Sequence, residues 1–355
     1  MKKILFTSLI LVVEIFISCS GSENLRKNDE PIFYPPPPDE PRIQYLTSIS
    51  SSNDISGEQS TITKFVVGEE EPLVIIKPYG LAARTDKIFI CDTQLSALIV
   101  IDLAERSLGY FTPQGRGKLK KPINCFIDEE GLLYVADSER GQIIIFDNEL
   151  NYRGEIGDSL ILKPTDVFVD ENKIYLNDIS SRKVNIYDKT SLKYLRSIPS
   201  ESEKKNQLYS PANISVSKNK IYVSDLGDSR IKVYDEKGNH IKTIGDIGNT
   251  PGKFSRPKGV AVDADGNIYV VDAGFENVQV FNSEGELLMF FGGSYSKPGD
   301  MWLPAKIFVD YKNINFFEDF VDPAFELKYL IYVTNQYGPD KINVYGFLSP
   351  KEIQK

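Results

Sequence analysis

The chain has 355 residues, 41% of them hydrophobic, and a formal net charge of −9 at pH 7. This length and composition allow one large folded body, whereas the acidic balance argues against nucleic acid as a partner, because phosphate binding needs a basic face. The single histidine, His240, does not follow a Cys-x-x-Cys pair. This excludes a haem attachment motif and argues against a histidine-ligated metal site or a Ser-His-Asp triad.

Residues 1–19 predict a lipoprotein-type signal peptide. Two lysines precede an apolar run at residues 4–13, and the segment ends at Cys19. It resembles the bacterial signal in which a cysteine after small residues is lipidated, and the run is too short for an ordinary membrane span. In proteins with such signals an aspartate after the cysteine can retain the protein in the inner membrane, and here that position is Ser20. We therefore expect a lipid on Cys19 and attachment to the outer membrane; the alternative is a signal without lipid.

Residues 20–41 predict a proline-rich tether between this anchor and the folded body. The segment is polar and then proline-dense, with four consecutive prolines at 35–38. Such a run favours extended polyproline II, which makes a stiff spacer. The alternative is a proline ligand for the aromatic groove of a partner.

A unit of about 45 residues recurs six times after the tether. Each unit opens with a proline, and five of the six carry an alternating run that ends in Asp and, ten residues later, a second run that closes in Asp or Asn. The opening prolines lie 42 to 47 residues apart: Pro78, Pro122, Pro164, Pro211, Pro257 and Pro304. The pattern predicts four strands per unit, with strand A after the proline, B in the first Asp-ending run, C in the second, and D after a turn.

The sixth unit lacks a fourth strand, while the strand-like segment at 42–50 precedes the first unit and belongs to none. An unpaired C strand would be an exposed edge, and the segment at 42–50 can cover it. The sequence therefore predicts an all-β fold at residues 42–348. This fold is a six-bladed β-propeller of four-stranded antiparallel blades, closed by an N-terminal strand that completes the last blade. Residues 349–355 are expected to form a C-terminal tail.

The units resemble NHL repeats. The fifth unit carries the pattern most fully: Gly252, Phe254, Pro257, Gly259, Asp263, Gly266 and Asp272. With its leader, the whole chain is similar to bacterial six-bladed NHL-type lipoproteins, a resemblance that implies the fold but not the function. WD40 repeats are disfavoured because their His and Trp signature cannot be written six times with one histidine and one tryptophan.

The start of strand A lies beside the central channel of a propeller, so the residue two positions after each proline should face its mouth. Four of these six are polar: Asn124, Asp166, Asn213 and Lys306. They could hold a ligand or a hard cation, or simply bind channel water. Lactonase-like propellers, which resemble this architecture, bind a divalent metal through Glu, Asn and Asp, and this ring contains no Glu. We therefore predict no metal and no cofactor.

The aspartates that end the B strands recur in five units: Asp92, Asp137, Asp178, Asp225 and Asp272. Because a catalytic residue would not be needed five times, we predict that each carboxylate caps its own B-to-C turn. Cys91 on a B strand and Cys125 on the next A strand come from neighbouring blades. A disulfide and two buried thiols are both compatible with the sequence.

An insertion at residues 311–329 separates strands A and B of the sixth unit. It combines acidic residues with Phe316, Phe317, Phe320 and Phe325. These aromatic side chains could contact a partner, since aromatic anchors dominate interface energetics. They could equally pack locally or plug the opposite mouth of the channel.

These patterns favour a lipid-anchored, monomeric propeller of the cell envelope that acts as a non-enzymatic scaffold for envelope proteins or an extracellular polymer. The alternative is a divalent-metal-dependent hydrolase, lactonase-like, with its centre at Asn124, Asp166 and Asn213.

Overall fold

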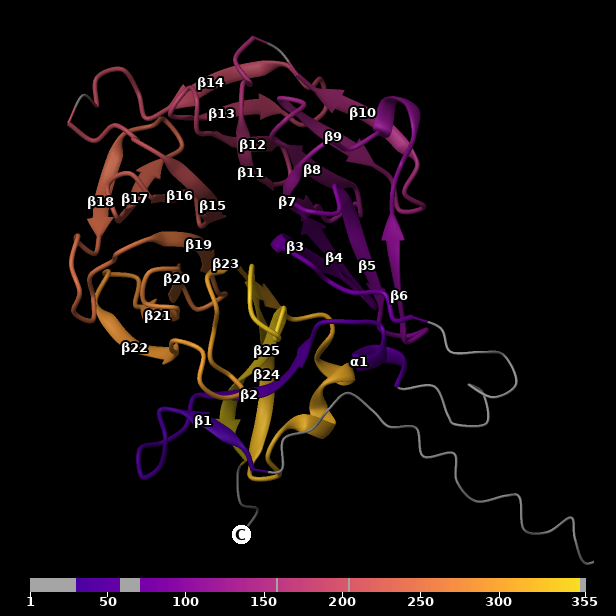
Figure 1. The fold of residues 1–355 in the computed structure, drawn as a ribbon. Helices are drawn as coiled ribbons and strands as arrows, with labels where there is room; N and C mark the ends of the chain where they lie inside the picture. The colour runs from indigo at the N-terminus through magenta and orange to yellow at the C-terminus, as the bar shows by residue number, and fades with distance from the viewer. Residues whose placement is uncertain (1–29, 58–70, 158, 204, 352–355) are drawn as a thin grey trace, which may run out of the picture.

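Six antiparallel sheets surround a central axis in the computed structural model (Figure 1), which describes residues 30–57, 71–157, 159–203 and 205–351. Blades one to five each contain four strands in chain order, as predicted. Blade one is β3 (Pro78–Arg84), β4 (Lys87–Asp92), β5 (Ala97–Asp102) and β6 (Ser107–Phe111). Blade two is β7 (Pro122–Ile127), β8 (Leu133–Asp137), β9 (Gln142–Phe146) and β10 (Tyr152–Ile156). Blade three is β11 (Pro164–Val169), β12 (Lys173–Asp178), β13 (Lys183–Asp188) and β14 (Tyr194–Ile198).

Blade four is β15 (Pro211–Ser217), β16 (Lys220–Asp225), β17 (Arg230–Asp235) and β18 (His240–Ile244). Blade five is β19 (Pro257–Val262), β20 (Ile268–Asp272), β21 (Asn277–Phe281) and β22 (Leu287–Gly292). Blade six is β23 (Pro304–Asp310), β24 (Phe325–Asn335), β25 (Ile342–Pro350), β2 (Ile43–Ile49) and β1 (Ile32–Tyr34). The only α-helical turn in the described part of the chain is α1 (Asn53–Ser56), and single 3-10 turns are η1 (Gly115–Gly117), η2 (Ile314–Phe316) and η3 (Glu318–Phe320).

The hydrophobic core lies between neighbouring blades. Strand alternation gives each sheet two apolar faces, and each face packs on the next blade. Phe89 of β4 packs with Val135 of β8, and Tyr134 of β8 packs with Ile174 of β12. Such seams leave the inner A strands around the axis, where polar side chains can gather. No described helix is long and apolar enough to cross a membrane.

The predicted closure of the ring is confirmed. Strand β2 pairs antiparallel with β25, from Ile43 opposite Phe347 to Ile49 opposite Ile342. Ile43, Leu46 and Ile49 are fully buried or nearly so. The first folded strand therefore completes the last blade and joins the two ends of the propeller.

The tether predicted at residues 20–41 is wrong in its second half. Strand β1 pairs with β2 as a fifth strand, and the Arg42 N–H donates to the Tyr34 carbonyl at 2.9 Å. Residues 32–34 contain no proline, so their N–H groups can pair, and the prolines that follow sit beside an edge strand, where they are tolerated. Residues 1–29, with the predicted signal and Cys19, lie outside the described residues.

The tail predicted at 349–355 also begins too early, because β25 continues to Pro350, which pairs with Phe325. The longer β24 and β25 form a ribbon that extends beyond the other strands of the blade. This extension is paired to the end of the insertion, so both features belong to one element. Residues 352–355 lie outside the described residues.

The insertion at residues 311–329 packs into the seam between blades six and one, beside α1 in Figure 1. Phe317 is 0% exposed, Phe320 is buried, and Phe316 and Phe325 pack partly buried against the same cluster. The Gln44 amide holds this segment, donating to the Phe320 carbonyl at 2.9 Å. Local packing therefore describes the insertion, and Phe317 and Phe320 are not accessible to a partner.

Truncation of Phe317 to alanine is expected to lower the free energy of unfolding by about 3–5 kcal/mol, because it removes a fully buried ring from this seam. The matched control is Phe290→Ala on β22, where the ring is 50% exposed and the change should stay within about 0.5 kcal/mol. Urea unfolding measures both. Equal losses in the two variants would contradict the packing described here.

Candidate functional site

The B-strand aspartates fix the loops around the mouth of the channel. Each is buried, and each carboxylate accepts three or four backbone N–H groups. Asp92, for example, binds Ile76 and Lys77 of the preceding loop and Gln94 and Leu95 of its own B-to-C turn. Each aspartate thus caps its own B-to-C turn, as predicted, and also binds the preceding D-to-A loop. The two connections lie together on one face, which we call the mouth face.

The four polar side chains predicted at the channel converge on the axis, where all four are buried. The Lys306 ammonium of blade six lies 2.6 Å from Asp166 Oδ2 of blade three, the blade opposite in a ring of six. The Asn124 amide donates to Asn213 Oδ1 at 3.1 Å. The axis is therefore crossed by an ion pair and an amide contact.

The Asp166 carboxylate is fully committed in this arrangement. In addition to its ion pair with Lys306, the carboxylate accepts hydrogen bonds from the N–H groups of Ile214 at 3.0 Å and Val167 at 2.9 Å. Burial raises the pKa of the Asp166 carboxyl, and the Lys306 ammonium opposes that rise. Removing either partner would leave a buried charge without compensation.

This donor set does not suit a divalent cation. Calcium and magnesium need several oxygen ligands with carboxylates among them, and the ring supplies one carboxylate, which already faces the Lys306 ammonium. Within the described ranges, no three His, Cys, Asp or Glu side chains are grouped as metal ligands would be. Asn124 Oδ1, Asn213 Nδ2 and both amide atoms of Asn177 are buried without a partner. Such atoms favour water or ligand atoms near the axis.

The mouth face carries a feature that sequence reasoning missed. The residue before the repeat proline is basic in four of the six units: Lys77, Lys121, Lys163 and Arg256. The capping aspartates place these residues around the mouth by binding their backbone N–H groups. The aligned repeats show these basic residues directly before the proline, whereas our prediction concerned only the residue two positions after it.

Three cations gather on blades five and one beside the hairpin between β24 and β25. Lys258 is 5% exposed, and its ammonium donates to Gln336 Oε1 at 2.9 Å. It also lies 5.5 Å from the ring centroid of Tyr79, while the Lys77 ammonium lies 5.0 Å from that of Tyr337. Burial, followed by the nearby charges of Arg256 and Lys77, lowers the pKa of Lys258 to about 8. We call Lys77, Arg256 and Lys258 the mouth cations.

The mouth cations have no acidic partner within 4.0 Å among the described residues. Other cations of the same face do: Lys306 pairs with Asp166, and Lys121 pairs with Glu139 at 3.5 Å. Two capping aspartates belong to the same blades as the mouth cations, Asp92 to blade one and Asp272 to blade five. Their carboxylates accept hydrogen bonds from backbone N–H groups, including those of Lys77 and Arg256. Among the described residues, the three cations therefore have no direct ion pair, and the nearby Asp92 and Asp272 carboxylates are directed to backbone N–H groups instead.

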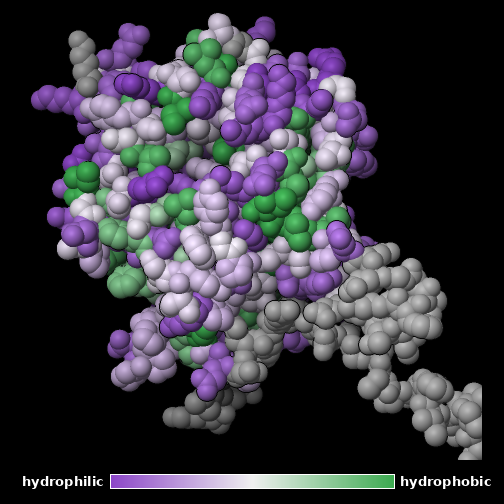
Figure 2. All heavy atoms as spheres, in the orientation of Figure 1, coloured by the Kyte–Doolittle hydropathy of each residue, from purple (hydrophilic) through white to green (hydrophobic). Residues whose placement is uncertain are grey.

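Exposed aromatic rings continue from the mouth cations along blade six. Trp302 is 48% exposed and stacks on Tyr295 with ring centroids 5.9 Å apart. It also packs on Gly338, where φ is +77° and a Cβ atom would lie 2.9 Å from the indole ring. Tyr337, next to this glycine, is 47% exposed. We call Tyr295, Trp302 and Tyr337 the aromatic strip. In the view of Figure 2, hydrophobic side chains gather in several clusters, one of them right of the centre, with hydrophilic side chains between them.

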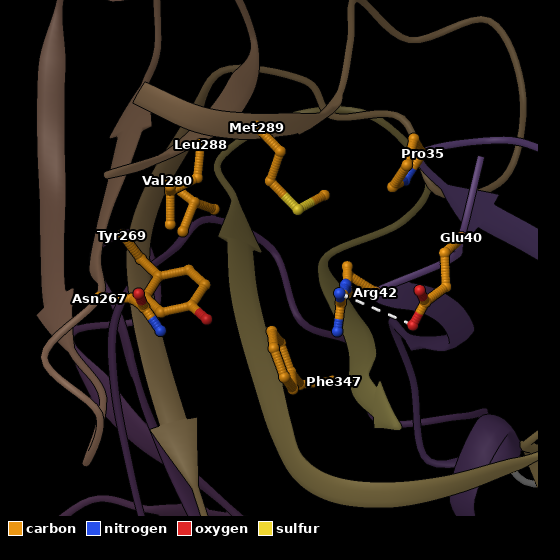
Figure 3. Close-up of a pocket in the computed structure, with 9 residues that line it drawn as sticks. All are labelled: Pro35, Glu40, Arg42, Asn267, Tyr269, Val280, Leu288, Met289 and Phe347. Atoms are coloured by element: carbon orange, nitrogen blue, oxygen red, sulfur yellow. Dashed lines mark ion pairs between the residues drawn. The ribbon is translucent and has the colours of Figure 1, made fainter. Parts of the chain in front are cut away.

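A pocket of about 460 Å³ lies at the rim between blades five and six (Figure 3). Its walls are mainly apolar: Pro35, Tyr269, Val280, Leu288, Met289 and Phe347. Arg42 and Glu40, which form a 3.7 Å ion pair, occupy one side. The sequence could not predict this pocket, because it depends on the proline-rich segment folding back on the blade.

Cys91 and Cys125 are both buried, and the structure holds them as free thiols. The Cys125 thiol donates to the Phe89 carbonyl at 3.7 Å. Burial, and then the neighbouring Cys125, raises the pKa of the Cys91 thiol. Neither thiol is thus reactive in the folded protein.

A Cys19→Ser protein kept free of reductant should therefore release two titratable thiols when unfolded and almost none when folded. A chromogenic disulfide reagent, with and without denaturant, measures both states. No titratable thiol after unfolding would show that Cys91 and Cys125 form a disulfide instead.

The comparisons with known proteins agree with the fold. A family model described as a six-bladed beta-propeller matches residues 195–289, and no curated protein matches the chain. A solved structure of unknown function from Bacteroides thetaiotaomicron is similar at 13% identity and a TM-score of 0.60, over 87% of this chain and 76% of that one. A streptogramin B lyase is similar at 13% identity and a TM-score of 0.53, over 78% and 84%.

A catalytically inactive virginiamycin B lyase from Staphylococcus aureus with quinupristin is similar at 15% identity and a TM-score of 0.53, over 77% of this chain and 96% of that one. At such identities these likenesses show the propeller fold and nothing about the reaction.

Proposed function

We propose that the protein is a lipid-anchored, non-enzymatic binding scaffold of the bacterial cell envelope that holds its ligand on the mouth face. The observation that carries this proposal is the axial ion pair between Asp166 and Lys306. It uses the only carboxylate of the predicted channel ring for structure, while the mouth cations and the aromatic strip remain open to solvent or unpaired. The mouth face thus offers cations and aromatic rings for binding, whereas the one carboxylate of the channel ring is held in an ion pair.

The position of histidine also favours binding over catalysis. His240 begins β18, the outermost strand of blade four, and its ring contacts Thr243 at 2.9 Å. It lies on the rim rather than at the axis, so it cannot serve as a general base at the mouth. A rigid disc with an accessible face suits a scaffold, because a preorganised surface loses little entropy on binding.

The proposal includes a membrane anchor: a lipid on Cys19 that attaches the protein to the outer membrane. Metabolic labelling with an alkyne fatty acid tests it: the wild-type protein should carry the label in the outer-membrane fraction, and Cys19→Ser should not. Equal labelling of both proteins, or label confined to the inner membrane, would contradict this part of the proposal.

Metal analysis separates the scaffold from a metal-dependent hydrolase. After mild purification, the wild-type protein and Asp166→Asn should both contain far less than one equivalent of any divalent metal. One equivalent in the wild type that is lost in Asp166→Asn, with folding intact, would overturn the proposal in favour of the hydrolase.

A further inference from the structure

We propose that the mouth cations and the aromatic strip form a binding site for a polysaccharide that carries carboxylate groups, that is, a polymer containing uronic acids. The inference rests on the proposed binding function and names its ligand class. It starts from a cluster of like charges: in a chain with a net charge of −9, Lys77, Arg256 and Lys258 lie at one place without a direct ion pair among the described residues.

The protein holds these cations together at a cost. Like charges repel, and Lys258 is also largely removed from water. Its pKa, lowered to about 8 by burial and by the two neighbours, reflects that cost. An anion between the three side chains would relieve it. Perturbed ionisable groups of this kind concentrate at functional sites.

Contacts across blades five, six and one bring the cations to one ligand-sized place. The Lys258 ammonium contacts both Gln336 of blade six and the ring of Tyr79 of blade one. The Lys77 ammonium lies over Tyr337 of blade six. The hairpin between β24 and β25 therefore stands between the charged residues of its two neighbours, and a carboxylate could contact a guanidinium and an ammonium together.

The aromatic strip points to a sugar rather than to a simple anion. Trp302 and Tyr337 are each about half exposed to solvent. Stacking on Tyr295 holds the Trp302 indole in place. The flat apolar faces of these rings suit the C–H faces of sugar rings. Rings beside cations along one rim match a chain of sugars in which carboxylates recur.

Isothermal titration of the full-length protein in detergent with an oligogalacturonate tests the site. We expect binding by the wild type, a loss of about tenfold or more in affinity for Arg256→Gln and for Lys77→Gln, and a comparable loss for Trp302→Ala. The matched control is Lys163→Gln, which removes an exposed cation of the same face on blade three and should leave the affinity unchanged. The melting temperatures of the Arg256 and Lys163 variants should match the wild type, because both side chains are exposed, whereas Trp302→Ala is compared only after its folding is verified at the titration temperature.

Three results with the wild type would overturn the inference: no binding of oligogalacturonate, equal binding of a neutral galacto-oligosaccharide, or tighter binding of inorganic polyphosphate. An equal loss in Lys163→Gln would show a general charge effect and would also overturn it. The proposed scaffold function would survive these results if the mouth face still captured a ligand in cells, so the two failures can be told apart.

Discussion

Replacing Lys306 with methionine is expected to lower the free energy of unfolding by about 3–5 kcal/mol, because it leaves the Asp166 carboxylate buried and unpaired. The loss should shrink as the pH falls. Burial already raises the pKa of Asp166, so without Lys306 the carboxyl takes up a proton more readily, and protonation removes the uncompensated charge. Denaturant unfolding between neutral and mildly acidic pH measures both effects.

The double variant Asp166→Asn/Lys306→Met should recover most of the lost stability, because neither charge then remains buried. Lys163→Met, on the same face but exposed, should change stability by no more than about 0.5 kcal/mol. A loss below about 1 kcal/mol in Lys306→Met, or no recovery in the double variant, would contradict the buried axial ion pair described here.

Deletion of residues 30–50 is expected to abolish cooperative folding. It removes β1 and β2, exposes the edge of β25, and takes Ile43, Leu46 and Ile49 out of the core. A protein that lacks only residues 2–29 provides the reference melting temperature. Thermal unfolding followed by circular dichroism, together with light scattering for aggregation, measures the difference.

Relocating the strand provides the control for this deletion. Ile43 pairs with Phe347, and the Leu348 N–H donates to the Arg42 carbonyl at 2.8 Å. Residues 42–50 joined after Lys351 through a short glycine-rich turn should therefore refill the same place as a hairpin strand. Restored folding would assign the defect to the missing strand. A deleted protein that melts like the wild type would contradict the closure.

The ring of blades could be predicted from the sequence because each blade repeats the same local sequence pattern. The proline before strand A, the Asp at the end of strand B and the turn before strand D recur at nearly fixed spacing, so six weak signals reinforce one another. Strand β1 and the end of β25 carry no repeat. Their pairing depends on a partner edge that exists only after the ring has closed, and a proline-rich run gives no local sign of it.

The insertion shows the same limit. The sequence left partner contact, local packing and a channel plug all open for its phenylalanines, because the strand pattern stops there; in the structure Phe317 and Phe320 fill the seam between blades six and one. At the channel, the positions of Asn124, Asp166, Asn213 and Lys306 followed from the repeats. The pairing of Asp166 with Lys306 follows from the number of blades, since the third and sixth face each other. The charge of the mouth face required the structure, because partnered and unpartnered lysines look alike in sequence.

The mouth face and the opposite face differ in what they offer a partner. The opposite face consists of A-to-B and C-to-D turns, with lysines such as Lys218, Lys237 and Lys312. Apart from the insertion of blade six, which contains Lys312, these hairpin turns are short and shaped mainly by their own backbone hydrogen bonds. The mouth face combines long D-to-A loops, unpaired cations and exposed rings, which are the features of a recognition surface.

The most direct test of the central claim is carbodiimide crosslinking in cells that express the tagged native protein, followed by mass spectrometry. This reagent joins lysine amines to carboxylates in contact, so it captures acidic proteins and acidic polysaccharides alike. The account predicts intermolecular adducts at Lys77 of the mouth face. Adducts confined to Lys218, Lys237 and Lys312 of the opposite face, or no adduct on the folded protein, would contradict a scaffold that binds through its mouth.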